Sequence, residues 1–184
     1  MKKTISIIIS IAMCAMLASC GGVKNGVSDT EQPTLMDTMS LEEKVGQILF
    51  VRCVDDEQTD DLMSIKPGGI LMFGRDFEGL TKDEVKEKIQ SYQDKSDIPL
   101  IIGADEEGGT VVRVSSNPNL APEKFKSPQE IYNEGGMDAV VENATEKSEL
   151  LLSLGVNMNL APVADVSTNP SDYMYDRSLG QNAE

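Results

Sequence analysis

Three carboxylates stand side by side at Asp105, Glu106 and Glu107, directly before two glycines. In a buried place such neighbours repel one another and raise the pKa of at least one carboxyl group, unless a cation offsets the repulsion. Arg113 is a candidate for that cation. The glycines permit a sharp turn and a close approach of the backbone to a ligand, so the segment is a candidate binding site. A solvated acidic turn is the alternative.

A metal ion at this acidic segment is a weaker interpretation. Consecutive strand residues point to opposite faces, so the three carboxylates cannot all converge on one ion. We therefore assign no metal site and predict no cofactor. A metal-dependent enzyme is the alternative, and it requires divalent ions to raise the melting temperature of the protein.

Further polar residues occur in two downstream segments. Asn159 and Asp165 are surrounded by apolar neighbours, so burial would demand hydrogen-bond partners for both. Most such residues are structural, and a direct ligand role is the alternative. The guanidinium of Arg177 has N–H donors in a fixed planar arrangement that suits the hydroxyl groups of a substrate. By itself, Arg177 is an ordinary surface arginine.

Composition excludes several classes of function. The chain has 184 residues, 40% of them hydrophobic, which excludes wholesale disorder. Lys and Arg total 16 against 31 Asp and Glu, so a nucleic-acid partner, which needs a basic face, is not expected. Histidine is absent, which excludes catalytic triads, metal ligands and proton relays that depend on it.

The first residues have the pattern of a targeting segment. Lys2 and Lys3 precede an apolar run over 5–18, which is shorter than the roughly 20 residues needed to cross a bilayer. We interpret 1–19 as a signal peptide and 20–38 as a polar tether. The residues around Cys20 look like a bacterial lipobox, which predicts a lipid anchor at Cys20 and a position on the extracytoplasmic face of the cell membrane.

The rest of the chain, 39–184, alternates amphipathic helices with apolar strands. Capping boxes at Ser40, Thr81 and Ser127 predict where helices begin. We expect a short helix from 41 and further helices over 55–65, 81–95, 127–135 and 137–154. The expected strands are 48–54, 68–73, 99–104 and 157–162.

This alternation predicts an α/β fold with a parallel sheet, which is either a (β/α)8 TIM barrel or a doubly wound sheet. Polar residues follow the third and fourth strands, as in barrels, whose active sites lie at the carboxyl ends of the strands. No glycine-rich turn follows Val51, as a dinucleotide-binding sheet would require. We therefore favour the barrel. About its first four βα units are present, because a whole barrel needs roughly 250 residues.

Together the motifs resemble glycoside hydrolase family 3, and most closely its β-N-acetylglucosaminidase (β-N-acetylhexosaminidase) branch. They are SLEEKVGQ at 40–47, GILMFGR at 69–75, DEEGGTVVR at 105–113, NLAPVADV at 159–166 and DRS at 176–178. The resemblance implies that Asp105 and Arg177 bind the sugar. Supporting roles go to Glu107, Arg113, Asn159 and Asp165. The family commonly has Gln at the position of Glu106 and often Arg at that of Thr110, so a sugar contact from Thr110 is in doubt.

The resemblance implies hydrolysis of terminal β-linked N-acetylglucosamine in cell-wall or chitin-type oligosaccharides by a retaining mechanism. In the family a Lys-His segment, an Asp-x-His acid/base pair and an Asp nucleophile follow further along, and this chain contains none of them. We therefore expect no catalytic residue in these 184 residues, which form the N-terminal part of the domain and are inactive alone. The alternatives are a β-glucosidase-type member of the family and a non-catalytic, lipid-anchored sugar-binding protein.

Overall fold

The computed structural model describes residues 33–52, 55 and 58–182. The predicted signal peptide, Cys20 and most of the predicted tether lie outside the described residues. The chain divides into one unit over Met1–Thr38, which holds helix α2 (Leu35–Thr38), and a second over Met39–Glu184. In the described part, no helix has the length and apolar character needed to cross a membrane. All that follows concerns the second unit.

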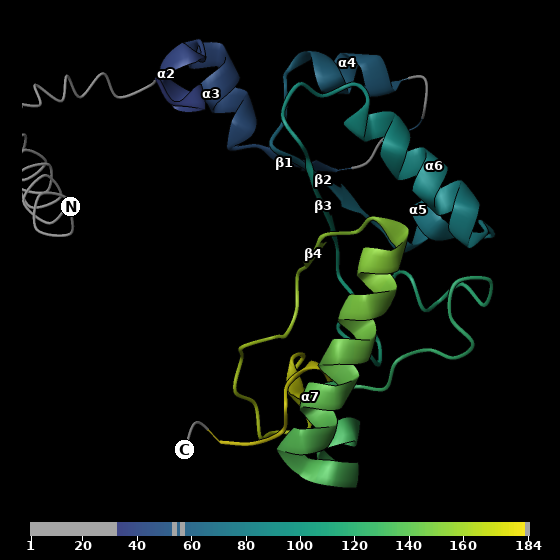
Figure 1. Ribbon diagram of the computed structural model, residues 1–184. Coiled ribbons are helices and arrows are strands. Elements are labelled where there is room, and N and C mark those ends of the chain that lie inside the picture. The colour runs from purple at the N-terminus through teal and green to yellow at the C-terminus, as the bar shows by residue number, and fades with distance from the viewer. Residues whose placement is uncertain (1–32, 53–54, 56–57, 183–184) are drawn as a thin grey trace, which may run out of the picture. The chain divides into compact units, whose positions relative to one another are not determined.

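A parallel sheet of four strands forms the centre of this unit (Figure 1). The strands are β1 (Phe50–Arg52), β2 (Gly69–Met72), β3 (Ile101–Ala104) and β4 (Met158–Asn159). Each strand pairs in parallel with the next along the chain. This order lacks the reversal of a doubly wound sheet, and it is the order in which a barrel begins.

Helices between the strands make the crossovers that parallel strands require, and further helices lie before the first strand and after the last. They are α3 (Leu41–Gln47), α4 (Thr59–Ser64), α5 (Gly74–Phe77), α6 (Lys82–Gln93), α7 (Pro128–Leu154) and the 3-10 helix η2 (Tyr175–Arg177). The capping boxes predicted at Ser40, Thr81 and Ser127 are all formed, so α3, α6 and α7 begin where the sequence predicts.

The structure differs from the sequence prediction in several elements. The two helices expected over 127–135 and 137–154 form one element, α7, which is kinked at Gly135 and Gly136. Gly136 has a φ of 66°, a left-handed conformation that favours glycine. The break that the sequence predicts between the two helices therefore coincides with the kink in α7. The strands are shorter than predicted, because Ile48 caps α3 and β1 pairs only with Gly69–Leu71. The helix predicted over 55–65 is confined to α4, and the short elements α5 and η2 were not predicted.

The two faces of the sheet differ in burial. Ile70, Met72, Ile102 and Ala104 are fully buried on one face, where α6 and α7 contribute Val85, Ile89, Tyr92, Leu151 and Leu154 to the same core. Because side chains alternate along a strand, the residues between them form the other face. There Phe50 and Ile101 are 38% and 41% exposed.

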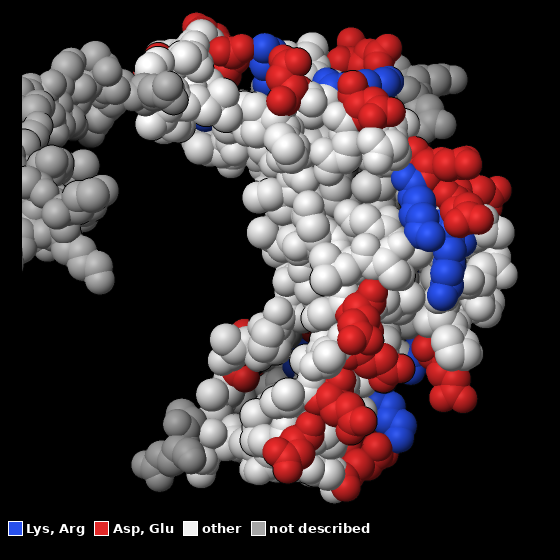
Figure 2. All heavy atoms as spheres, viewed as in Figure 1, with Lys and Arg blue, Asp and Glu red and all other residues white. Residues whose placement is uncertain are grey.

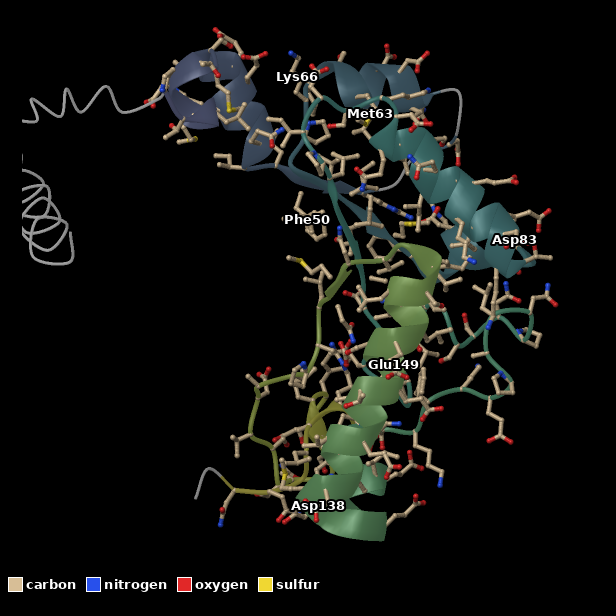
Figure 3. All side chains as sticks on the ribbon, in the orientation of Figure 1. Phe50, Met63, Lys66, Asp83, Asp138 and Glu149 are labelled. Carbon is tan, nitrogen blue, oxygen red and sulfur yellow. The ribbon has the colours of Figure 1, made fainter. Side chains whose placement is uncertain are left out.

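Phe50 lies on the face of the sheet away from α6 (Figure 3). Its ring crosses Gly69, where a Cβ atom would lie 2.6 Å from Cδ2 of Phe50, and it also covers Gly103. Both glycines are therefore needed for this close approach.

Charged side chains are distributed unevenly on the helices. Acidic residues run along α7, and basic residues lie beside α6 (Figure 2). The exposed acids of α7 are Glu130, Glu134, Asp138, Glu142, Glu146 and Glu149. A row of acidic side chains repels polyanions.

Candidate functional site

The candidate site lies at the carboxyl edge of the sheet, where residues from neighbouring strands come together. Arg52 ends β1, Asp105 directly follows β3 and Asn159 ends β4. The strands are parallel and in sequence order, so these ends share one edge.

Asp105 pairs with the cation that the sequence predicted. The Nη2 atom of Arg113 lies 2.9 Å from Oδ2 of Asp105, and the two side chains are 25% and 21% exposed. The guanidinium of Arg113 also lies 5.5 Å from the centre of the Phe73 ring. Asp105 is thus held in one orientation by Arg113 and still reaches solvent.

Glu106 is fully buried and faces away from solvent. Its carboxylate accepts backbone N–H groups from Arg113 at 2.8 Å, Val114 at 2.7 Å and Ser115 at 3.3 Å, together with the Ser115 hydroxyl. Such charge-assisted bonds fix the 113–115 turn and therefore the position of Arg113. Sequence reasoning missed this role, because partners that are mostly backbone groups leave no pattern of residue types.

Glu107 forms a bidentate ion pair with Arg177, which lies 70 residues further along the chain. Nη2 of Arg177 lies 2.6 Å from Oε1 of Glu107, and Nε lies 2.9 Å from Oε2. The hydrogen bonds with Glu107 raise the pKa of the Arg177 guanidinium, with some further contribution from the charge of Glu107. Glu107 is 5% exposed and Arg177 is 21% exposed, so the arginine is the member that faces solvent.

Lys147 is a buried cation beneath the acidic segment, and sequence reasoning did not single it out. Its Nζ donates to the backbone oxygen of Glu107 at 2.8 Å. Burial lowers the pKa of Lys147, while the charges of Glu106 and Glu107 oppose that shift. A signal was available, since Lys147 lies three residues after Ala144 and four before Leu151, on the apolar face of the helix.

Asn159 holds the backbone of Glu106 from β4. Its side-chain oxygen accepts the Glu106 N–H at 3.0 Å, and its amide nitrogen donates to the Glu106 oxygen at 3.1 Å. Asn157 makes the same kind of double contact with the N–H of Ile102 and the oxygen of Leu100. Asp165 is exposed, and it makes no hydrogen bond or ion pair with the described residues, so the structure does not join it to this group.

The three adjacent carboxylates therefore have three different environments. Asp105 faces Arg113, Glu106 faces backbone N–H groups and Glu107 faces Arg177. Within the described ranges, no group of three or more acidic, cysteine or histidine side chains is placed to hold a metal ion. The arrangement presents one carboxylate, that of Asp105, and the guanidinium groups of Arg113 and Arg177 partly to solvent. Together these groups can accept hydrogen bonds from hydroxyl groups and donate to them.

A polar pocket of about 410 Å³ adjoins the turn after the acidic segment. It is lined by Gly109, Thr110, Ser127, Gln129, Glu130 and Asp176. Its volume falls in the range of small-molecule sites.

The family model described as Glycosyl hydrolase family 3 N terminal domain matches residues 40–184. The chain belongs to glycoside hydrolase family 3. The resemblance seen in the sequence is thus confirmed.

Relatives of known name agree with this family. Beta-hexosaminidase LpqI of Mycobacterium tuberculosis is 25% identical over 98% of this chain and 50% of its own length. Beta-hexosaminidase A of Pseudoalteromonas piscicida is 30% identical over 62% of this chain and 20% of its own length. The chain thus spans half or less of the length of these two relatives.

Solved structures of the family have the same fold. A family 3 β-N-acetylglucosaminidase from Paenibacillus has a TM-score of 0.65 at 25% identity, over 74% of this chain and 26% of that one. A family 3 member from Mycobacterium smegmatis has a TM-score of 0.64 at 24% identity, over 77% of this chain and 42% of that one. The α/β prediction and the partial barrel are confirmed by these likenesses.

Proposed function

We propose that this family 3 domain serves the hydrolysis of terminal β-linked N-acetylglucosamine from cell-wall or chitin-type oligosaccharides. The observation that carries the proposal is the pair of carboxylate–guanidinium contacts, Asp105 with Arg113 and Glu107 with Arg177, at one edge of the sheet. The hexosaminidase names of the relatives support this choice of sugar over glucose.

Asp105 and Arg177, one residue from each ion pair, have different roles in this proposal. Asp105 accepts hydrogen bonds from sugar hydroxyls, and Arg177 donates to them from an orientation fixed by Glu107. Both are binding residues, since holding a sugar in a reactive geometry lowers the barrier only where a nucleophile and an acid are also present. For the whole protein we propose a retaining mechanism, in which a carboxylate attacks the anomeric carbon and an acid protonates the leaving oxygen.

Binding and hydrolysis should be measured separately to test this function. We expect the 184-residue chain to bind N-acetylglucosamine in preference to glucose by isothermal titration calorimetry, and Asp105→Asn to lose that binding. We also expect no release of chromophore from a chromogenic N-acetylglucosaminide by this chain. Tighter binding of glucose would favour the β-glucosidase alternative, and turnover by the chain would overturn the assignment of the catalytic groups.

We also propose that Cys20 carries a lipid anchor, which places the domain on the extracytoplasmic face of the membrane. The support is the sequence Leu17 to Gly21 after a short apolar run. Mass spectrometry of the protein purified from a bacterial membrane fraction should show a diacylated N-terminal cysteine. Cys20→Ala should move the protein to the soluble fraction, and an unmodified Cys20 in the membrane fraction would contradict the proposal.

A further inference from the structure

Lys147 of α7 is buried against the segment that follows β3. Its side chain belongs to a residue that is 7% exposed, and its Nζ donates to the backbone oxygen of Glu107 at 2.8 Å. The same Nζ lies 5.8 Å from the centre of the Phe125 ring, which comes from the loop before α7. Contacts from two parts of the chain therefore fix the place of this ammonium group.

The surroundings of Lys147 are mostly apolar. Lys147 and Glu107 both line a cavity of about 180 Å³, whose apolar lining comes from α7 and from Ala161 and Pro162 after β4. Among the described residues that line this cavity, only Lys147 and Glu107 carry charge. Charges interact more strongly in such surroundings than in water, because few polar groups are present to screen them.

Lys147 supplies a third cation for the three adjacent carboxylates. Asp105 and Glu107 each form an ion pair with an arginine, whereas Glu106 is bound by N–H and hydroxyl groups. Burial lowers the pKa of Lys147, and the charges of Glu106 and Glu107 oppose that shift. The ammonium group thus offsets negative charge that the two arginines do not balance.

The effect of Lys147 reaches the proposed sugar site through Glu107. The carboxylate of Glu107 accepts two N–H groups of Arg177, at 2.6 and 2.9 Å, so both of its oxygens act as acceptors. An ionised carboxylate can do this, but a protonated carboxyl group has one oxygen that donates. Lys147 therefore acts in two ways on the group that orients Arg177, by holding its backbone oxygen and by its positive charge.

We propose that Lys147 is a positioning residue for sugar binding, which acts on Arg177 through Glu107. Lys147 does not touch the sugar itself, because it is buried and its ammonium group is bonded to the Glu107 backbone. This inference rests on the proposed function, since it requires a sugar at Arg177. It adds a residue of α7 to the groups at the carboxyl edge of the sheet on which binding depends.

The first test is isothermal titration calorimetry of the 184-residue chain with N-acetylglucosamine at neutral pH. Lys147→Met keeps a side chain of similar length without the charge, and we expect it to weaken binding about tenfold. Lys86→Met is the matched control, because Lys86 is half exposed on α6, and it should bind as the unaltered chain does. Circular dichroism verifies that each variant is folded at the temperature of the titration.

A double variant distinguishes positioning from a general effect on stability. Glu107→Gln removes the carboxylate through which Lys147 acts, so adding Lys147→Met to it should weaken binding by less than about twofold further. Two independent effects of about tenfold would instead multiply to about a hundredfold.

The pH dependence of binding tests the proposal in the unaltered chain. Among the described residues, the charges that act on Lys147 are those of Glu106 and Glu107, and its other neighbours Phe125 and Asn159 are uncharged. Sugar affinity should fall as the pH rises toward about 10.5, because Lys147 loses its proton within that range. Lys147→Met should bind weakly throughout. Lys147→Arg should keep part of the affinity without the decline, because a guanidinium group keeps its charge.

The outcomes separate this inference from the proposed function. If the chain binds N-acetylglucosamine and Asp105→Asn abolishes that binding, but Lys147→Met binds normally, the positioning role is wrong and the proposed function stands. Multiplied effects in the double variant, or the same alkaline decline in Lys147→Arg as in the unaltered chain, also contradict the role. If Lys147→Met does not fold, the pH profiles of the unaltered chain and Lys147→Arg decide. If the unaltered chain binds no sugar, both proposals fail.

Discussion

At the scale of single residues, the proposed function makes sugar binding depend on the ion pair between Glu107 and Arg177. Glu107→Gln replaces one charged acceptor by an amide and leaves Arg177 partly buried without its counter-charge. We expect unfolding to require about 2 kcal/mol less free energy and sugar affinity to fall about tenfold, because hydrogen bonds to charged groups contribute on that scale. Chemical denaturation and calorimetric titration measure the two effects.

The matched control for this variant is Glu134→Gln. Glu134 also forms a close ion pair, with Lys126, but both side chains are more than half exposed. Exposed pairs contribute little, so we expect stability to change by less than about 1 kcal/mol and sugar affinity to stay the same. Equal effects of the two substitutions would show that Glu107 has no special role.

Lys147 gives a prediction about pH at the same scale. Burial lowers its pKa in the folded chain, so between that lowered value and the ordinary value of about 10.5 the unfolded chain binds more protons. In that window the contribution of Lys147 to the free energy of unfolding rises with pH, and below it the contribution is constant. We therefore expect the stability of the unaltered chain relative to Lys147→Met to increase as the pH rises toward about 10.5. Urea denaturation at a series of pH values measures this difference.

Lys86→Met is the control for the pH experiment. Lys86 is half exposed and lies near Asp83 on the surface of α6. Its stability difference from the unaltered chain should have a weaker dependence on pH. Parallel curves for the two lysine variants would mean that Lys147 titrates as a surface lysine does.

At the scale of elements, a capping box at Ser127 fixes the beginning of α7. The Ser127 hydroxyl accepts the Glu130 N–H at 3.3 Å and donates to the Glu130 carboxylate at 2.8 Å. Ser127→Ala removes this cap, which costs about 1 kcal/mol of stability in comparable helices. Ser148→Ala is the control on the same helix, because its exposed hydroxyl only bonds back to the Ala144 oxygen. Loss of the Ser148 hydroxyl should leave the stability measured by thermal denaturation nearly unchanged. An equal loss of stability in Ser127→Ala and Ser148→Ala would contradict a capping role for Ser127.

The elements also show what sequence can and cannot predict here. Local signals suffice for the starts of α3, α6 and α7, since a capping box is complete within four residues. The ends of the strands cannot be predicted from local sequence, because they depend on where the neighbouring strand stops pairing. The short α5 and η2 are too brief to produce a periodic pattern.

Some contacts of the candidate site join residues that are close in the sequence, and others join residues that are far apart. Asp105 and Arg113 lie eight residues apart, within one turn-rich segment, and their pairing was expected. The partners of Glu107 are 70 residues away in η2 and 40 residues away in α7. Those contacts exist only after α7 has docked on the sheet, so no spacing in the sequence predicts them.

At the scale of the whole described unit, the sheet buries one face and leaves apolar side chains exposed on the other. Ile101 and Ile102 are adjacent in β3, but they are 41% and 0% exposed. We predict that Ile102→Ala lowers the free energy of unfolding by about 2 to 5 kcal/mol, since it creates a cavity in the core. Ile101→Ala should cost clearly less than Ile102→Ala, because Ile101 keeps 41% of its surface exposed in the folded chain.

The same exposed face predicts self-association of the 184-residue chain. Apolar surface of this kind promotes contacts between molecules, so Ile101→Ser should reduce concentration-dependent association measured by sedimentation velocity. Denaturation at low protein concentration separates the two effects, because association then contributes little to stability. Equal losses of stability for Ile101→Ala and Ile102→Ala under those conditions would contradict the two-faced sheet. They would require both sides of β3 to be packed within a single molecule.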